Sequence, residues 1–181
     1  DEILCRGGIA LLLKKMRKVL YPQSPDRVVC SPMRRCIQTA AWICPKGYPY
    51  RIEDDLRETN FGIFEGKTYE ELKGDPDYQR WLASNGEGPI PQGESRMQMC
   101  ARCLAGFERQ VDCALQEGKK ELLFVVHGGS IMAILERYAQ PARPFYAFHV
   151  DNGDGYILEI PDGQPLHGRY PVQKLGEEEN K

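Results

Sequence analysis

The sequence predicts a three-layer α/β/α sandwich with a mostly parallel sheet. Segments that read as short strands alternate with amphipathic helical segments, an order typical of layered α/β folds. The most apolar strand segment, Leu122–Val126, contains no alternating polar residue. Strands of this kind are typical of parallel sheets that are covered on both faces.

We expect one domain over residues 1–181, because this length suits a single hydrophobic core. The 41% apolar and 28% charged residues exclude a disordered chain. The net charge of -2 argues against a nucleic-acid partner, and no apolar run is long enough to span a membrane. Seven irregularly spaced cysteines favour reduced thiols in a cytoplasmic protein, with Cys100 and Cys103 packing in the core.

Periodicity and turn residues give the individual elements. Apolar residues recur every three or four positions over 94–117, which predicts a long helix. Ser31 suits a helix N-cap and Pro32 a first helical position, so a helix of roughly 33–44 should follow. The other predicted segments are strands at 27–30, 50–53, 122–126, 145–150 and 156–160, helices at 8–20, 69–73, 76–83 and 130–138, and an acidic, solvated tail at 175–181.

Two of the predicted strands lead into residues that can bind an anion. Strand 27–30 is followed by Arg35, and strand 122–126 is followed by His127 and Gly128. The carboxyl ends of parallel strands meet at one edge of a sheet, and here each leads into a helix N-terminus. An arginine and a histidine at such an edge suit a phosphate group. From the residues alone, a satisfied imidazole at a strand end and a surface salt bridge stay open as simpler interpretations.

Four motifs resemble those of the histidine-phosphatase, or phosphoglycerate-mutase-like, superfamily. Residues 31–40 read S-P-M-R-R-C-I-Q-T-A, which is similar to S-P-L-x-R-A-x-Q-T-A. Residues 56–66 read L-R-E-T-N-F-G-I-F-E-G, which is similar to L-x-E-x-x-F-G-x-W/F-E-G. Residues 91–95 read P-Q-G-E-S and resemble P-x-G-E-S, and V-V-H-G at 125–128 resembles the strand that carries the family's second histidine.

The resemblance implies roles for particular residues. Arg35 would bind the phosphoryl group, and Glu58 would donate a proton to the leaving group. His127 and the backbone amide of Gly128 would stabilise the phosphoryl oxygens. The family needs no metal and no cofactor, because arginines supply the positive charge.

Several other residues are expected to be structural. Without the motif, Glu58 itself would read as a surface carboxylate paired with Arg57 or Lys67. Glu94 and Ser95 are expected to cap the helix over 94–117. The remaining residues given packing, turn or structural roles are Trp42, Glu65, Trp81, His149 and Asn152.

The start of the sequence aligns just downstream of the family's R-H-G turn. Asp1, Leu4 and Gly8 match the D-x-x-L-x-x-x-G stretch that opens the family's first helix. We expect the first strand and the R-H-G loop, with the phosphorylated histidine and a second arginine, to lie upstream of residue 1. A sheet without that strand would leave backbone groups exposed. The alternative is an inactive, truncated protein, because His167 in Leu166-His167-Gly168 is not expected to replace the missing histidine.

The resemblance implies a phosphomonoesterase that hydrolyses a small phosphate ester through a phosphohistidine intermediate. F-G-I-F-E-G-K-T at 61–68 resembles α-ribazole phosphatases, which makes α-ribazole 5′-phosphate a candidate substrate. Residues 67–95 are expected to form a lid over the site. One alternative is a phosphoglycerate mutase-type phosphotransferase, and another is a non-catalytic phosphate-ligand-binding or interaction protein. The alcohol half of the substrate and the oligomeric state stay open.

Overall fold

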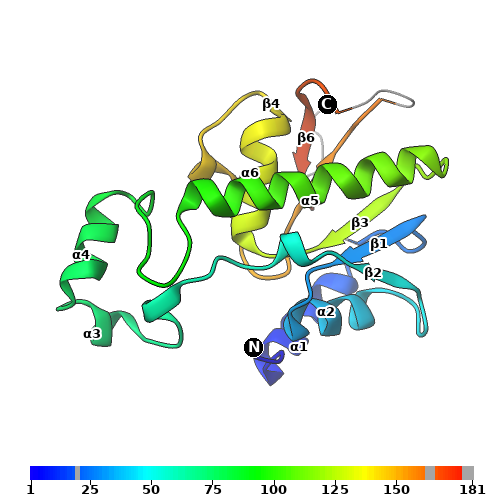
Figure 1. Ribbon diagram of the computed structural model, residues 1–181. Helices are drawn as coiled ribbons and strands as arrows, with labels where there is room; N and C mark the ends of the chain where they lie inside the picture. Colours follow the sequence, from blue (N-terminus) through cyan, green and yellow to red (C-terminus); the bar gives the residue numbers. More distant parts are fainter. Residues whose placement is uncertain (19–20, 162–165, 177–181) are drawn as a thin grey trace.

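The computed structural model describes residues 1–18, 21–161 and 166–176. Its central layer is a parallel sheet with helices on both faces (Figure 1). Helices α1 (Arg6–Met16) and α2 (Arg34–Ile43) cover one face, and α5 (Arg96–Gln116) and α6 (Gly128–Tyr138) cover the other. The predicted three-layer α/β arrangement is therefore confirmed.

The parallel sheet has the strand order β2-β1-β3. The central strand β1 (Arg27–Cys30) pairs in parallel with β2 (Tyr50–Ile52) and with β3 (Leu122–Val125). In this register the last residue of β1 lies opposite the last residue of β3. The chain therefore leaves both strands at the same edge of the sheet.

Burial of β1 on both faces explains why its sequence lacks polar alternation. Val28 and Cys30 pack against α1 and α2, in a cluster that also contains Val125 of β3. Val29 points to the opposite face and packs against α5 and α6. All three of these β1 side chains are at most 1% exposed. Because both faces are covered, each position along the strand must be apolar or must find a polar partner.

A second small sheet packs beside α6. Its order is β4-β6-β5, where β4 (Ala139–Gln140) runs parallel to β6 (Tyr170–Lys174), and β5 (Tyr156–Leu158) runs antiparallel to it. Side chains of β5 and β6 pack on α6 in a separate apolar cluster. The predicted strand at 156–160 is confirmed in its first three residues, whereas β4 and β6 were not predicted.

The predicted strand at 145–150 is wrong. The segment is a 3-10 helix, η3 (Phe145–Phe148), that follows Pro144. Phe145 and Phe148 are buried, while Tyr146 between them is 54% exposed. Side chains three residues apart lie on one face of a 3-10 helix, so this spacing buries both phenylalanines.

Two further predictions of element ends need correction. Ser31 does not cap α2, because Met33 is the N-cap residue and makes no side-chain cap bond. The helix predicted over 8–20 ends at Met16 within the described residues. Residues 19–20 and the last five residues of the predicted 175–181 tail lie outside the described part of the chain.

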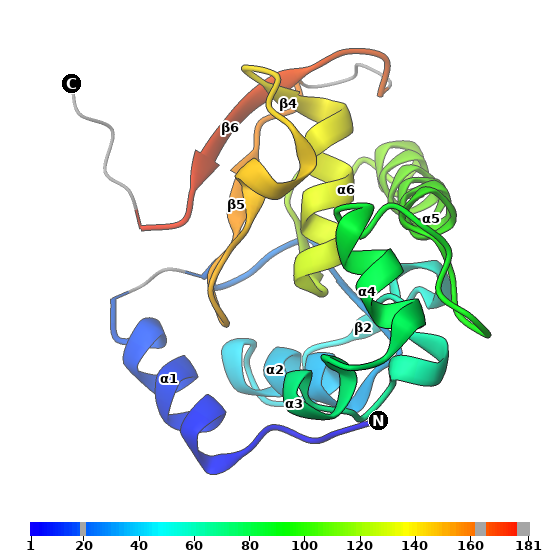
Figure 2. The same ribbon diagram turned by 90° about the vertical axis from the view of Figure 1, so that its left-hand side faces the viewer.

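Residues 62–90 form a lobe that projects beyond the sandwich (Figures 1 and 2). It contains η2 (Gly62–Phe64), α3 (Tyr69–Leu72) and α4 (Pro76–Ala83), in agreement with the two short helices that the sequence predicted. The buried residues of its own apolar cluster are Phe64, Leu72 and Ile90, and Trp81 packs against them. The packing role predicted for Trp81 is confirmed, whereas Trp42 on α2 is 42% exposed.

The small core of the lobe makes it sensitive to a single deletion. Leu72→Ala removes a side chain that is 4% exposed, so we expect the lobe to be destabilised by about 2–4 kcal/mol. Leu82→Ala is the matched control, because Leu82 on α4 is 39% exposed. Hydrogen exchange of peptides from residues 67–90 should rise strongly in the first variant and little in the second. Equal exchange in the two variants would contradict this account of the lobe.

Candidate active site

Ser31, which follows β1, joins the ends of the two strands by hydrogen bonds to Val125 and to His127. The backbone N–H of Ser31, just after β1, donates to the carbonyl of Val125 at the end of β3 (3.1 Å). The Ser31 Oγ lies 2.7 Å from Nε2 of His127. Ser31 is 0% exposed and His127 is 6% exposed, so this contact fixes the imidazole ring inside the protein.

Arg35 contacts the other nitrogen of the same ring. It lies in the first turn of α2, and its Nη2 is 3.2 Å from His127 Nδ1. A guanidinium group can only donate hydrogen bonds, so Nδ1 must accept. The proton of the neutral ring is thereby assigned to Nε2, which donates to the Ser31 hydroxyl oxygen. That hydroxyl oxygen also accepts a bond from the Met33 N–H (3.3 Å).

Glu58 completes the group from a third direction. It lies between η1 (Asp54–Leu56) and η2, and its Oε2 is 3.8 Å from His127 Nδ1. Its Oε1 accepts a hydrogen bond from the next residue's N–H, that of Thr59 (2.9 Å). Arg57 turns the other way and pairs with Asp54 (3.7 Å). The structure thus brings Arg35, Glu58 and His127 together, as the sequence predicted.

The environment of His127 keeps its imidazole neutral. Burial, followed by the positive charges of Arg35 and Arg102, lowers the pKa of His127 to about 3. A neutral ring retains the lone pair on Nδ1 that accepts from Arg35. The neutral ring therefore accepts at Nδ1 and donates at Nε2.

A buried thiol beside His127 was missed by the sequence reasoning. The Sγ of Cys36 lies 3.5 Å from Nε2 of His127, and the residue is 4% exposed. Burial raises the pKa of Cys36 to about 11, so the thiol stays protonated at neutral pH. The signal was available in the 31–40 motif, where cysteine stands at the position of alanine in the pattern that it resembles.

The N-terminus of α6 adds positive potential to the site. His127 is the N-cap residue of α6 and makes no side-chain cap bond, so the first amides of this helix, beginning with Gly128, face the strand edge. A Cβ atom at Gly129 would lie 2.9 Å from Oε1 of Glu58. Glycine at this position therefore allows the carboxyl group to approach the start of α6.

The remaining residues of the 31–40 motif hold the surrounding backbone. Oε1 of Gln38 accepts a hydrogen bond from the Leu4 N–H (2.8 Å), which ties the N-terminal stretch to α2. The Thr39 hydroxyl donates to the carbonyl of Arg35 (2.8 Å). This motif thus supplies Arg35, which contacts His127, and two side chains that bond to the backbone around it.

The 56–66 and 91–95 motifs lie backbone against backbone. Gly62 has a φ angle of +49°, and a Cβ atom there would lie 2.2 Å from the Pro91 carbonyl oxygen. A Cβ atom at Gly93 would lie 2.4 Å from the carbonyl oxygen of Asn60. Both positions therefore need glycine, because any side chain would push the two loops apart.

Three polar residues of these motifs each hold a different part of the backbone. Ser95 caps α5 in a capping box with Gln98, as predicted. Glu94 does not cap the helix, because its carboxylate instead accepts from the Asn60 N–H (2.8 Å) and pairs with Arg102. Glu65 accepts from the Phe61 N–H (2.9 Å), a contact that fits its predicted structural role.

The other polar residues that the sequence analysis considered are exposed to solvent. His149 and His167 are exposed, and Asn152 lies in an exposed turn. Among the described residues, no group of three His, Cys, Asp or Glu side chains is placed to hold a metal ion. Within the same residues, no helix is both long and apolar enough to cross a lipid bilayer.

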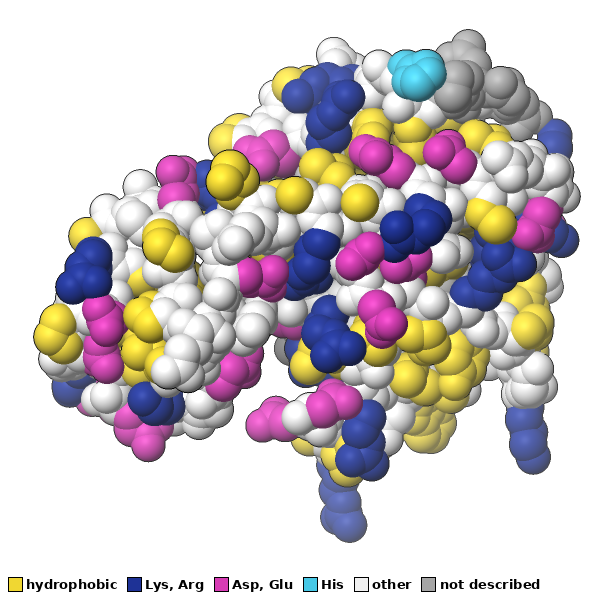
Figure 3. Space-filling view, viewed as in Figure 1, with side chains coloured by type: hydrophobic (Ala, Val, Ile, Leu, Met, Phe, Trp, Pro, Cys, Tyr) yellow, Lys and Arg dark blue, Asp and Glu magenta, His cyan; other side chains and the backbone are white. Residues whose placement is uncertain are grey.

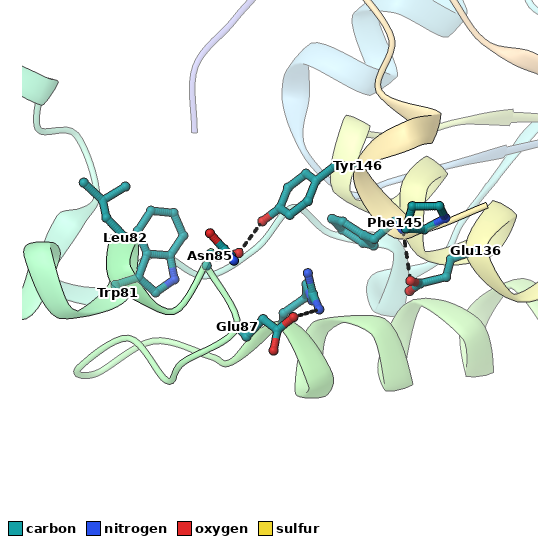
Figure 4. Close-up of a pocket in the computed structure, with 10 residues that line it drawn as sticks. Trp81, Leu82, Asn85, Glu87, Glu136, Phe145 and Tyr146 are labelled. Atoms are coloured by element: carbon teal, nitrogen blue, oxygen red, sulfur yellow. Dashed lines mark hydrogen bonds and ion pairs between the residues drawn. The ribbon is translucent and has the colours of Figure 1, made fainter.

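A separate pocket of about 490 Å³ lies between the lobe and η3 (Figure 4). Its lining includes the aromatic residues Trp81, Phe145 and Tyr146, and none of the three clustered residues described above. The Tyr146 hydroxyl donates to the carbonyl of Asn85 (2.8 Å), which links η3 to the end of the lobe.

The fold and this cluster of arginine, histidine and carboxyl groups are typical of enzymes that handle phosphoryl groups. The family model of the histidine phosphatase superfamily (branch 1) matches residues 12–170, and the chain belongs to this superfamily.

Individual relatives include both phosphatases and mutases. The chain is 33% identical over 116 residues to a broad-specificity phosphatase of Saccharomyces cerevisiae, an alignment that covers 61% of this chain and 48% of the relative. It is 31% identical over 91 residues to a 2,3-bisphosphoglycerate-dependent phosphoglycerate mutase of Methanosarcina acetivorans, covering 49% of this chain and 36% of the relative. The chain thus spans about half or less of the length of these relatives.

The fold is also that of a solved phosphatase structure. The alpha-ribazole phosphatase from Shigella flexneri superposes with a TM-score of 0.77 at 23% identity. The superposition covers 96% of this chain and 84% of that one. This similarity establishes the shared phosphoglycerate mutase-like fold.

The low pKa of His127 predicts a stability loss in mild acid. Below pH 6.5 the unfolded chain binds a proton at this residue, whereas the folded protein does not until pH approaches 3. The contribution of His127 is therefore fully present above pH 6.5 and falls by about 1.4 kcal/mol per pH unit below it. Chemical denaturation between pH 7 and pH 4.5 should show a shallower fall for His127→Gln than for the wild type. Equal slopes for His127→Gln and the wild type would contradict the low pKa of His127.

Proposed function

We propose that this protein hydrolyses small phosphate monoesters through a phosphohistidine intermediate. The observation that carries the proposal is the convergence of two side chains on the His127 imidazole, with Arg35 Nη2 at 3.2 Å and Glu58 Oε2 at 3.8 Å from Nδ1. Membership of the histidine phosphatase superfamily supports the same chemistry. The substrate class is a small-molecule phosphate ester, and we place the protein in the cytoplasm.

The proposed nucleophile is the histidine of the family's R-H-G turn, which is not among the 181 residues. Its ring nitrogen would form a bond to phosphorus while the bond from phosphorus to the alcohol oxygen breaks. Water would then attack the phosphohistidine and release inorganic phosphate. Dividing one difficult displacement into two steps is the usual benefit of covalent catalysis.

Arg35 and His127 are proposed to hold the phosphoryl group. The planar guanidinium of Arg35 can grip two oxygens, and the amide of Gly128 adds a donor at the start of α6. A phosphate that enters between Arg35 and His127 would bring negative charge to a neutral imidazole. That charge favours the protonated ring, which could then donate to a third oxygen.

Glu58 is proposed to serve as the general acid and then as the general base. It would donate a proton to the departing alcohol oxygen and later accept one from the attacking water. Its position beside His127 and the start of α6 places it on the rim of the same cluster. The Thr59 N–H bonds one carboxyl oxygen and leaves the other directed toward His127.

The lobe is proposed to act as a lid over bound substrate. Figure 3 shows a notch on this face between the projecting lobe and the body of the molecule. The predicted lid, residues 67–95, comprises most of the lobe and the segment that leads into α5. A phosphate ester bound at the strand edge would place its alcohol half toward this notch.

A phosphoglycerate mutase-type reaction is the second candidate, because one of the relatives is a mutase. The two reactions differ in the fate of the phosphoryl group. Hydrolysis of α-ribazole 5′-phosphate, with release of inorganic phosphate, would support the proposed phosphatase and its candidate substrate. Phosphoglycerate isomerisation without phosphate release would instead identify a mutase.

Two adjacent arginines allow a sharp test of the proposed phosphate site. In the protein as its gene encodes it, Arg35→Met should lower kcat/KM for p-nitrophenyl phosphate by about 10²–10³-fold. Arg34→Met is the matched control, because Arg34 is exposed at the variable position of the motif. Its activity should stay close to that of the wild type. Equal losses in the two variants would contradict the assignment of Arg35.

Phosphate binding separates an enzyme from a binding protein. Calorimetric titration with inorganic phosphate should show binding that is lost in Arg35→Met and kept in Arg34→Met. Binding without turnover of any ester would point to the non-catalytic alternative. Turnover that survives in His127→Ala would contradict the proposed site.

A further inference from the structure

Arg102 on α5 binds the backbone that carries Glu58. Its Nη1 donates to the carbonyl oxygens of Asp55 (2.8 Å) and Arg57 (2.6 Å). Its Nη2 donates to the carbonyl oxygen of Glu58 (3.0 Å). One guanidinium group therefore satisfies three carbonyl groups within a four-residue stretch.

Glu94 holds the same loop from its other side. Its carboxylate binds Arg102 through Nε (2.9 Å) and through Nη2. It also accepts from the Asn60 N–H (2.8 Å), and its own N–H donates to the carbonyl of Asn60 (3.0 Å). The Arg102–Glu94 pair thus holds the chain just before and just after the Glu58 side chain.

The pair is partly shielded from water. The exposed fractions of the two side chains are 23% for Arg102 and 15% for Glu94. Burial alone would raise the pKa of the Glu94 carboxyl, but the hydrogen bonds from Arg102 and Asn60 outweigh it and hold that pKa below its ordinary value. Glu94 is therefore an ionised partner, and its bonds to Arg102 are charge-assisted.

The direction of the Glu58 carboxyl depends on the backbone that this pair holds. Because Oε1 bonds to the N–H of Thr59, the side chain is tied to the peptide that follows it. Oε2 lies 3.8 Å from His127, and Oε1 lies where a Cβ atom at Gly129 would be only 2.9 Å away. A small displacement of the loop would either separate the carboxyl from His127 or press it against α6.

We propose that Arg102 and Glu94 are positioning residues that set the Glu58 carboxyl group for proton transfer to the leaving group. The proposal rests on the function proposed above, because it assumes that Glu58 is the general acid. Neither residue needs to touch the substrate. Their effect would pass through the carbonyl and amide groups of residues 55–60.

Arg109 provides a matched comparison on the same helix. It pairs with the Glu53 carboxylate (2.7 Å) and with the Asp55 carboxylate. These bonds go to side chains and leave the carbonyl groups around Glu58 untouched. Its side chain is 54% exposed, so its removal should disturb the site little.

The choice of leaving group distinguishes positioning from general stabilisation. p-Nitrophenyl phosphate has a leaving group that needs little protonation, whereas an alkyl phosphate such as glycerol phosphate needs a general acid. In Arg102→Met we expect kcat/KM for the alkyl phosphate to fall by about 10²-fold, since misplacing a reacting group by about 1 Å has an effect of this size. kcat/KM reports the steps up to histidine phosphorylation, in which the leaving group departs, so its value for p-nitrophenyl phosphate should fall much less. Affinity for inorganic phosphate should change only a few-fold, because Arg35 and not Arg102 holds the phosphate.

Arg102→Lys and Glu94→Gln are milder variants, which test the same role even if Arg102→Met fails to fold. Arg102→Lys keeps the charge but cannot span several carbonyl groups, so it should recover only part of the lost rate. Glu94→Gln should show the same leaving-group selectivity as Arg102→Met, to a smaller extent. Glu58→Gln should reproduce that selectivity in full, and Arg109→Met should show none of it.

Amide exchange gives a readout that does not need turnover. Exchange in peptides that contain Asn60 should rise in Arg102→Met and in Glu94→Gln, and it should stay unchanged in Arg109→Met. Unchanged exchange in the first two variants would overturn the proposal, and so would equal rate losses for both esters. A wild-type protein without any phosphatase activity would remove the proposed function, and the positioning role of the pair with it. The exchange data would then still show whether the pair restrains the loop.

Discussion

Cys30 at the end of β1 lies directly opposite Val125 at the end of β3, and both strands run in the same direction. The residues that follow the two strands must therefore leave the sheet side by side. This register brings Ser31 within hydrogen-bonding distance of His127, 96 positions further along the sequence. It also sets the starts of α2 and α6 at one edge, so that Arg35 reaches the same imidazole. The contacts of Ser31 and Arg35 with His127 follow from this parallel pairing.

Burial of these groups determines the protonation state of the His127 ring. A histidine between a guanidinium and a hydroxyl, and shielded from water, cannot easily accept a proton, and its pKa lies near 3. Under the proposed function, a bound substrate phosphate would supply the negative charge that favours the protonated ring. An incoming phosphate dianion would satisfy Arg35, the first amides of α6 and a protonated imidazole together.

Local pattern was sufficient to predict the helices and the three strands of the parallel sheet. The apolar residues of the helices recur with a single period, and the central strand β1 is buried on both faces. It failed for Phe145–Phe148, which forms a 3-10 helix where the pattern predicts a strand, and for Tyr170–Lys174, a strand that contains a proline. It also failed for Glu94, because the partner that removes this residue from the helix cap, Arg102, follows eight positions later on α5. Such contacts depend on how the loop around Glu58 packs against the start of α5, and no local sequence pattern contains that information.

The four motifs divide into two structural tasks. The motifs at 31–40 and 125–128 place an arginine and a histidine at the strand edge, where register alone brings them together. Glu58 has no strand beneath it, because it lies in a loop between two short 3-10 helices. The motif at 91–95 supplies what that loop lacks: Gly93 allows close backbone packing, and Glu94 joins the loop to Arg102. A carboxyl group on a loop can act with the same geometry as groups on rigid strands only if its backbone is held this closely.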